Sequence, residues 1–117
     1  MVLLQYLSLI DILQEVAIRG KPLLGVCLGM QLFMDESHEF GVHKGLGLIP
    51  GKVIPVYPFG VNNTSLNIPH IGWSSLEPSF TDAWIESILE TFNPFKDSVY
   101  FVHSYKVDLE DESMVQR

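Results

Sequence analysis

Cysteine is nearly absent from the sequence, because Cys27 is the only one among 117 residues. A single cysteine excludes a disulfide within the chain and a cysteine-rich zinc site. Basic residues are also few: 7 Lys and Arg stand against 14 Asp and Glu, and the formal net charge is −7. Nucleic acids and anionic membranes attract basic surfaces, so this chain is a poor candidate for either partner.

Long hydrophobic runs are absent as well. The most apolar beginning, residues 1–10, is interrupted by Gln5 and Ser8 and is too short to span a bilayer. It has neither a basic start nor a small-residue cleavage site, so it does not resemble a signal peptide. With 47% apolar and 18% charged residues, the composition also excludes a disordered chain. We therefore expect a soluble, cytoplasmic protein.

The order of the expected elements indicates an α/β fold. Ser8 is a candidate N-cap, and apolar residues at helical spacing follow it until Gly20, which predicts a first helix. The apolar run over residues 23–27 predicts a buried strand, and residues 28–36 predict a second helix. Helix, strand and helix in this order are typical of a mostly parallel sheet flanked by helices.

Shorter elements are expected in the rest of the chain. Thr81 is a candidate N-cap for a third helix. Two short strands are expected over residues 52–57 and 68–73, and the third helix over residues 82–92. A longer strand, rich in β-branched and aromatic residues, is expected over residues 98–107, followed by a loosely held acidic tail over residues 108–117.

Residues 25–29, Gly-Val-Cys-Leu-Gly, form a G-x-C-x-G pattern between the expected strand and helix. The serine counterpart of this pattern holds a nucleophile on a sharp, strained turn, where glycines leave room for neighbouring segments. A helix N-terminus at Cys27 would stabilise its thiolate, and the Leu28 amide would point at the oxyanion formed on attack. The pattern alone also fits an inert buried cysteine, several hydrolase classes and some redox-active proteins.

A longer set of motifs narrows these alternatives. Residues 21–31, KPLLGVCLGMQ, resemble the nucleophile segment of class I glutamine amidotransferases. Further segments resemble, in the right order, those of one branch of that family, the glutaminase subunits of imidazole glycerol phosphate synthase. These segments are residues 36–39 (ESHE), 45–51 (GLGLIPG), 69–73 (PHIGW) and 100–105 (YFVHSY). The resemblance extends from about residue 12 to residue 107.

The resemblance implies a role for several residues. Cys27 would attack the side-chain amide of glutamine, release ammonia and form a glutamyl thioester. Gln31 and Glu39 match positions that hold the substrate glutamine. An amide and a carboxylate suit this role, because they can form hydrogen bonds with the α-amino and amide groups of the substrate. Ser104 and Tyr105 match a backbone segment that lines the same pocket.

The resemblance also implies a partner. Trp73 matches an aromatic residue at the contact with a TIM-barrel cyclase, which would receive the ammonia as the other half of a heterodimer in histidine biosynthesis. No cofactor is implied. A related amidotransferase for the amination of bacterial surface sugars is the close alternative.

Some family features are missing from the sequence. Residues 1–7 contain no glycine where the family has a glycine-rich oxyanion loop, and no histidine is followed by Pro-Glu. Ser74 stands where the family usually has asparagine. We therefore expect one incomplete amidotransferase domain over residues 1–117, truncated at both ends, marginally stable and inactive alone. The non-catalytic alternative is a truncated product that keeps the partner surface.

The four histidines suggest no metal centre. His38 and His43 are one residue too far apart to share a helical face, and Gly41 lies between them. We therefore expect no metal site. His70 and His103 are expected to be structural, and a role for either as the base for Cys27 is the alternative.

Overall fold

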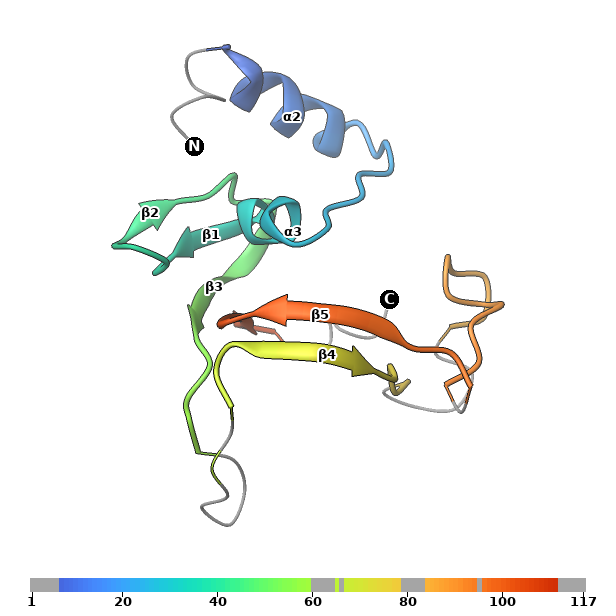
Figure 1. The fold of residues 1–117 in the computed structure, drawn as a ribbon. Coiled ribbons are helices and arrows are strands. Elements are labelled where there is room, and N and C mark those ends of the chain that lie inside the picture. The colour runs from blue at the N-terminus through green and yellow to red at the C-terminus, as the bar shows by residue number, and fades with distance from the viewer. Residues whose placement is uncertain (1–6, 60–64, 66, 79–83, 95, 112–117) are drawn as a thin grey trace. The chain divides into compact units, whose positions relative to one another are not determined.

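The computed structural model describes residues 7–59, 65, 67–78, 84–94 and 96–111 (Figure 1). The chain divides into two compact units, each considered by itself below. The first unit comprises Met1–Pro55 and Tyr105–Asp111, and the second comprises Val56–Ser104 and Glu112–Arg117. Within the described ranges, the helices lack the length and apolar character needed to cross a membrane.

Helix α2, Leu9–Ile18, confirms the first predicted helix. Its predicted cap is wrong in one respect: Ser8 adopts a left-handed conformation (φ 53°, ψ 33°), and its side chain makes no capping hydrogen bond. The predicted end at Gly20 is confirmed. Gly20 has φ 73°, and the amides of Gly20 and Lys21 donate to carbonyls of the last turn at 2.9 and 3.2 Å. Glycine accepts this conformation without steric strain, which ends the helix.

The strand predicted over residues 23–27 is not formed. The segment has no regular secondary structure, and the side chains of Leu24 and Val26 are 75% and 73% exposed. A strand exists only where a neighbour completes its backbone hydrogen bonds, and no strand among the described residues pairs with this segment. The apolar run therefore lies open on the surface of the first unit.

The second helix is shorter than predicted. Helix α3 spans Leu28–Phe33, and strand β1, Met34–Ser37, begins directly after it. Met34 has extended dihedral angles (φ −70°, ψ 169°), so the backbone leaves the helix there. The prediction of helix up to Glu36 is wrong because residues 34–37 pair with two other strands.

A four-stranded sheet forms the centre of the first unit, with the order β2-β1-β3-β6, of which Figure 1 labels β1, β2 and β3. Strand β2 is His43–Lys44, β3 is Ile49–Pro55 and β6 is Tyr105–Leu109. β1 pairs with β3 in parallel, whereas the β1–β2 and β3–β6 pairs are antiparallel. The predicted α/β class is confirmed. The sheet is mixed rather than mostly parallel, because two of its three pairings are antiparallel.

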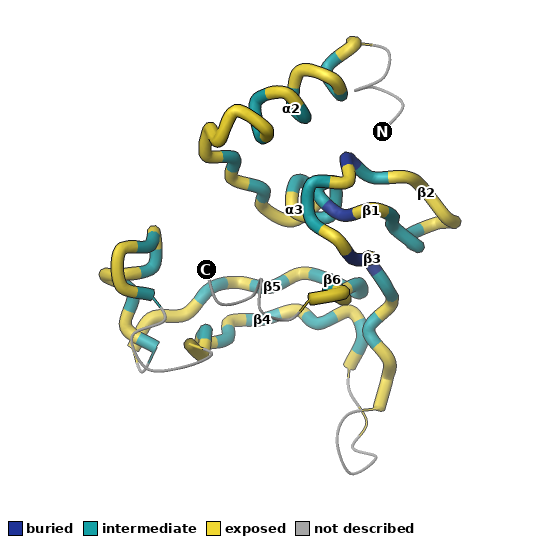
Figure 2. The backbone as a smooth tube through the Cα atoms, turned by 180° about the vertical axis from the view of Figure 1, so that it is seen from behind, coloured by how far each residue is buried: buried dark blue, intermediate teal, exposed yellow. Residues whose placement is uncertain are grey.

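The buried core of this sheet is small. Among the described residues only Met34, Leu46 and Val53 are buried hydrophobics, with 1%, 2% and 0% of their surface exposed (Figure 2). Gly45 allows this packing, since a Cβ there would overlap the backbone carbonyl of Met34. So few buried side chains in the described part contribute little hydrophobic stabilisation, and the expected marginal stability stays a prediction.

The second unit contains a two-stranded antiparallel sheet. Strand β4, His70–Ser74, lies beside β5, Val99–His103 (Figure 1). Both strands were predicted, but the expected strand over 98–107 is divided at Ser104, and its second half is β6. β6 also takes up residues 108 and 109, which were expected in the tail, while residues 112–117 lie outside the described part.

The helix predicted over residues 82–92 is wrong for its described part. Residues 84–91 form successive turns instead of an α-helix. Glu86 has a left-handed φ of 58°, which an α-helix does not accommodate. The Ser87 hydroxyl bonds to the Trp84 carbonyl at 2.7 Å and accepts from the Leu89 amide at 3.1 Å. Such local side-chain bonds compete with helical ones. The proposed cap, Thr81, lies outside the described residues.

Candidate functional site

Cys27 occupies a strained turn at the start of α3. Its backbone dihedrals, φ 53° and ψ −115°, fall in a sparsely populated region for a residue with a side chain. Such a conformation costs about 1–3 kcal/mol and is found preferentially at functional sites. The predicted strained turn at the nucleophile position is therefore confirmed. The cysteine is free and exposed, so a substrate can reach its sulfur from solvent.

The two glycines of the motif have different roles. A Cβ on Gly25 would lie 2.6 Å from Cε2 of Phe33 and 2.7 Å from backbone atoms of both Gly29 and Met30. Contacts this short do not occur for real Cβ atoms, so only glycine fits at position 25. A Cβ on Gly29 would meet nothing within 4 Å. The expected need for space is thus confirmed at Gly25 and wrong at Gly29, because the chain closes on only one side of Cys27.

The first turn of α3 presents backbone and side-chain groups next to Cys27. The backbone amide of Gln31 donates to the Cys27 carbonyl at 3.1 Å, and the backbone amide of Gly29 donates to the Val26 carbonyl at 2.9 Å. Within the described ranges no acceptor is found for the Leu28 amide, which suits the predicted oxyanion donor. Gln31 lies four residues after Cys27, and helical residues at this spacing are neighbours on one face.

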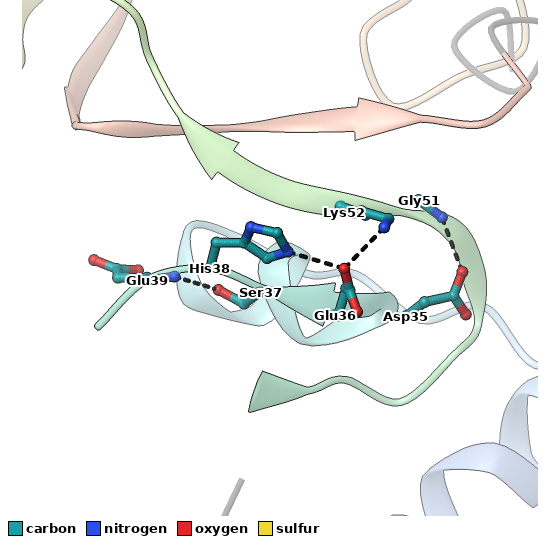
Figure 3. Close-up of polar contacts among 7 residues, drawn as sticks. All are labelled: Asp35, Glu36, Ser37, His38, Glu39, Gly51 and Lys52. Carbon is teal, nitrogen blue, oxygen red and sulfur yellow. Dashed lines mark hydrogen bonds and ion pairs between the residues drawn. The ribbon is translucent and has the colours of Figure 1, made fainter. Parts of the chain in front are cut away.

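Glu39 lies in the loop between β1 and β2. The loop is braced at its start, where the Glu39 amide donates to Oγ of Ser37 at 3.3 Å (Figure 3). In the described part of the chain, no hydrogen bond or ion pair occupies the Glu39 carboxylate. That carboxylate is therefore available to a cationic group, although no hydrogen bond or ion pair among the described residues joins it to Cys27 or Gln31.

A polar cluster beside this loop was not predicted. Oε1 of Glu36 lies 2.9 Å from Nε2 of His38 and 3.0 Å from Nζ of Lys52 (Figure 3). Hydrogen bonds from His38 and Lys52 lower the pKa of Glu36, and the bond to Glu36 raises the pKa of Lys52. The cluster joins the end of β1 to β3 and so steadies the entry to the loop that carries Glu39.

No pattern in the sequence predicts this cluster. The four residues of β1, Met-Asp-Glu-Ser, include no β-branched or aromatic side chain, and the first three lie within the predicted helix over residues 28–36. Only the register of β1 against β3 places Glu36 opposite Lys52. A second bond, from the Gly51 amide to Oδ2 of Asp35 at 3.0 Å, joins the same two strands.

The other two predicted pocket residues belong to different units. Tyr105 begins β6 in the first unit, is half-buried and pairs with Pro55. Ser104 belongs to the second unit, where its carbonyl accepts from the Val56 amide at 2.8 Å. A shared glutamine pocket with Cys27 stays a prediction.

Trp73 is exposed, which suits the partner contact that the resemblance implies for it. Its side chain is 70% accessible, and its ring meets that of the cross-strand residue Tyr100 edge-on, with the centroids 5.4 Å apart. Ile71 lies two residues before Trp73 on β4, and Val102 lies two residues after Tyr100 on β5, so all four side chains are on the same face of the sheet. Ile71 and Val102 are also more than half exposed. Together Ile71, Trp73, Tyr100 and Val102 form an apolar sheet face, which we call the β4–β5 face.

Comparisons with known proteins show the family to which the chain belongs. Residues 5–116 match the family glutamine amidotransferase class-I. The chain is 47% identical over 100 residues to imidazole glycerol phosphate synthase subunit HisH 1 of Legionella pneumophila (strain Lens), covering 85% of this chain and 46% of that protein. It is 44% identical over 114 residues to subunit HisH of Aquifex aeolicus, covering 96% of this chain and 49% of that protein.

A more distant subunit HisH, from Oceanobacillus iheyensis, is 40% identical over 110 residues, which cover 94% of this chain and 49% of that protein. The chain thus spans about half the length of the curated relatives it matches. Because the family match covers almost all of its residues, the chain belongs to the class I glutamine amidotransferase family.

Proposed function

We propose that this chain carries the nucleophile half of the glutaminase subunit of an imidazole glycerol phosphate synthase. The subunit hydrolyses glutamine to glutamate and ammonia. It passes the ammonia to a TIM-barrel cyclase that forms imidazole glycerol phosphate in histidine biosynthesis, in a cytoplasmic heterodimer. The observation that carries this proposal is the exposed Cys27 on its strained turn. The backbone of Gly29 and Met30 lies so close to Gly25 that only glycine fits there. The names of the relatives support the pathway.

The chemistry begins at the sulfur of Cys27. The thiolate attacks the side-chain carbonyl carbon of glutamine, and the Leu28 amide donates to the oxyanion that forms. The carbon–nitrogen bond then breaks, and the nitrogen leaves as ammonia after it takes up a proton. Water hydrolyses the remaining glutamyl thioester, which releases glutamate and restores the thiol. No histidine in the 117 residues is followed by Pro-Glu, so the acid–base pair of the family is not assigned to this chain.

Two side chains hold the substrate in this proposal. The carboxylate of Glu39 accepts charge-assisted hydrogen bonds from the α-ammonium group of glutamine. The side-chain amide of Gln31, one helical turn after Cys27, forms hydrogen bonds with the polar groups near the reacting carbon. Ser104 and Tyr105 complete the wall of the pocket.

The β4–β5 face is the proposed contact with the cyclase. Large exposed aromatic residues with apolar neighbours are typical anchors of protein interfaces, and Trp73 with Tyr100 forms such a group. A docked cyclase would cover Trp73 and receive ammonia without its loss to solvent.

A chimera tests the proposal. Residues 5–116 replace the matching segment of the Aquifex aeolicus subunit, and glutamate release is measured with the cyclase of that organism. We expect glutamine-dependent turnover that Cys27→Ala abolishes. His43→Ala is the matched control, since the hydrogen bonds of the described residues join this exposed side chain only to the Phe40 carbonyl, at 3.3 Å. Turnover that survives Cys27→Ala would refute the assignment of the nucleophile.

A further inference from the structure

Strand β3 contains a bulge opposite β1, beside the polar cluster described above. Met34 pairs with Ile49, whereas Glu36 pairs with Lys52, so β3 has one more residue than β1 between these two pairs. In an unshifted register, Glu36 would lie opposite Gly51 and not opposite Lys52. Bulges redirect side chains in this way and are over-represented next to active sites.

Two features at the bulge fix the shifted register. The Gly51 amide donates to Oδ2 of Asp35 at 3.0 Å, which joins the bulge to β1 (Figure 3). Gly51 has a φ of 147°, and a Cβ there would lie 2.5 Å from the carbonyl oxygen of Asp108, so only glycine fits. The residues at positions 35 and 51 therefore bring Glu36 and Lys52 together.

We propose that Glu36 and Lys52 are positioning residues, whose ion pair holds the loop that presents the Glu39 carboxylate to the substrate. In the proposed function, on which this role rests, that carboxylate binds the α-ammonium group of glutamine. Oε1 of Glu36 lies 3.0 Å from Nζ of Lys52, and Glu36 is three residues before Glu39 along the chain. The Glu39 carboxylate points away from the ion pair (Figure 3), so the pair acts on Glu39 through the backbone and not by direct contact.

Backbone hydrogen bonds connect the ion pair to Glu39. The His38 amide donates to the Val53 carbonyl at 2.9 Å, so the residue after Lys52 on β3 holds the residue before Glu39. The Glu39 amide donates to Oγ of Ser37 at 3.3 Å. The imidazole of His38 also contacts, at 2.9 Å, the carboxylate oxygen that Lys52 contacts. Each residue from the ion pair to Glu39 is therefore held, and loss of the ion pair loosens the start of this series.

The same stretch of chain carries the nucleophile at its other end. Helix α3 begins directly after Cys27, and β1 begins directly after α3 at Met34, which is 1% exposed. In the proposed function Cys27 reacts with the amide end of glutamine, while Glu39 holds the ammonium end. No bond changes at the ammonium end, so a loosened loop weakens the binding of substrate and transition state alike. The KM for glutamine should therefore rise while kcat stays the same.

Glutamine kinetics of the chimera with its cyclase test this role. The side chains of Lys52 and Glu36 are 49% and 30% exposed, and exposed ion pairs contribute little. We therefore expect Lys52→Met and Glu36→Gln each to raise the KM for glutamine by about 2–5-fold. Lys52→Arg keeps the cation and should retain the wild-type KM. Arg19→Met is the matched control, because it removes an exposed ion pair with Glu15 of α2 and should leave the KM unchanged.

Hydrogen exchange of the 117-residue chain reports the state of the loop without any turnover. Opening of the loop exposes the amides of His38 and Glu39, so Lys52→Met should speed their exchange by about 2–5-fold, whereas Arg19→Met should not. Unchanged exchange of both amides in Lys52→Met, or faster exchange with an unchanged KM, would overturn the proposal and leave an ordinary surface ion pair. Absence of turnover that depends on Cys27 in the unsubstituted chimera would instead refute the proposed function, and the exchange rates would still decide whether the pair holds the loop.

Discussion

The closure of the chain on Gly25 leads to a prediction with a built-in control. In Gly25→Ala the new methyl group would meet Phe33 at 2.6 Å and the backbone of Gly29 and Met30 at 2.7 Å. Backbone atoms cannot move aside as a flexible side chain can, so the strained turn at Cys27 must open. Overpacking of this kind typically costs about 1–3 kcal/mol. For a chain with three buried hydrophobic residues in its described part, this loss is a large fraction of the total stability.

Gly29→Ala is the matched change within the same motif. A Cβ there would meet nothing within 4 Å, and position 29 lies inside α3. Alanine in a helix is more stable than glycine by about 0.5–1 kcal/mol, so this variant should gain stability. The two substitutions add the same methyl group, and only their surroundings differ.

Pulse proteolysis in urea measures both variants, because cleavage of the unfolded fraction reports the folding equilibrium. With a urea dependence of about 2 kcal/mol per molar, Gly25→Ala should lower the midpoint by about 0.5–1.5 M, whereas Gly29→Ala should raise it slightly. Equal destabilisation by the two variants would refute the reasoning, since it would mean that both glycines face a closed chain.

Five further predictions concern single residues and the isolated chain. Met34→Ala should cost about 2–5 kcal/mol and largely unfold the first unit in a proteolysis assay, whereas Phe40→Ala, at a 92% exposed position, should change nothing. Because its neighbours hold the pKa of Glu36 below 4.5, the stability advantage of wild type over Glu36→Gln should persist above that pH and disappear as pH falls through the lowered pKa. In urea titrations, the Lys52 contribution should instead be present below pH 10.5 and disappear as pH rises through its raised pKa. In the chimera with its cyclase, Trp73→Ala should lower the ammonia used per glutamine hydrolysed, and unchanged coupling would return Trp73 to a purely local role. The 117-residue chain alone should release no measurable glutamate, since loss of a positioned acid–base group typically costs about 10²–10⁴ in rate; activity that depends on Cys27 would contradict this.

The elements that the sequence predicted well are those specified by local chemistry. The helix that ends at Gly20 and the strained turn at Cys27 depend on a few adjacent residues, and the structure contains both. Glycine at positions 20 and 25 leaves a local signature because no other residue accepts those conformations or spaces without strain.

The elements that were missed depend on long-range pairing. Residues 23–27 are apolar enough for a strand, yet no described strand lies beside them to complete their hydrogen bonds. Conversely, β1 has little strand propensity and forms because β2 and β3 pair with it on both sides. The bonds from Glu36 to Lys52 and from His70 to His103 are likewise products of strand register, which the local sequence does not encode.

Covalent labelling of Cys27 tests the central claim most directly. The chimera is treated with an electrophilic analogue of glutamine, with and without glutamine, and the labelled peptide is identified by mass spectrometry. If Cys27 is the nucleophile of a glutaminase, one label per chain should appear on that residue, and glutamine should prevent it. Labelling of Cys27 that glutamine does not slow, or a label on any other residue, would contradict the account.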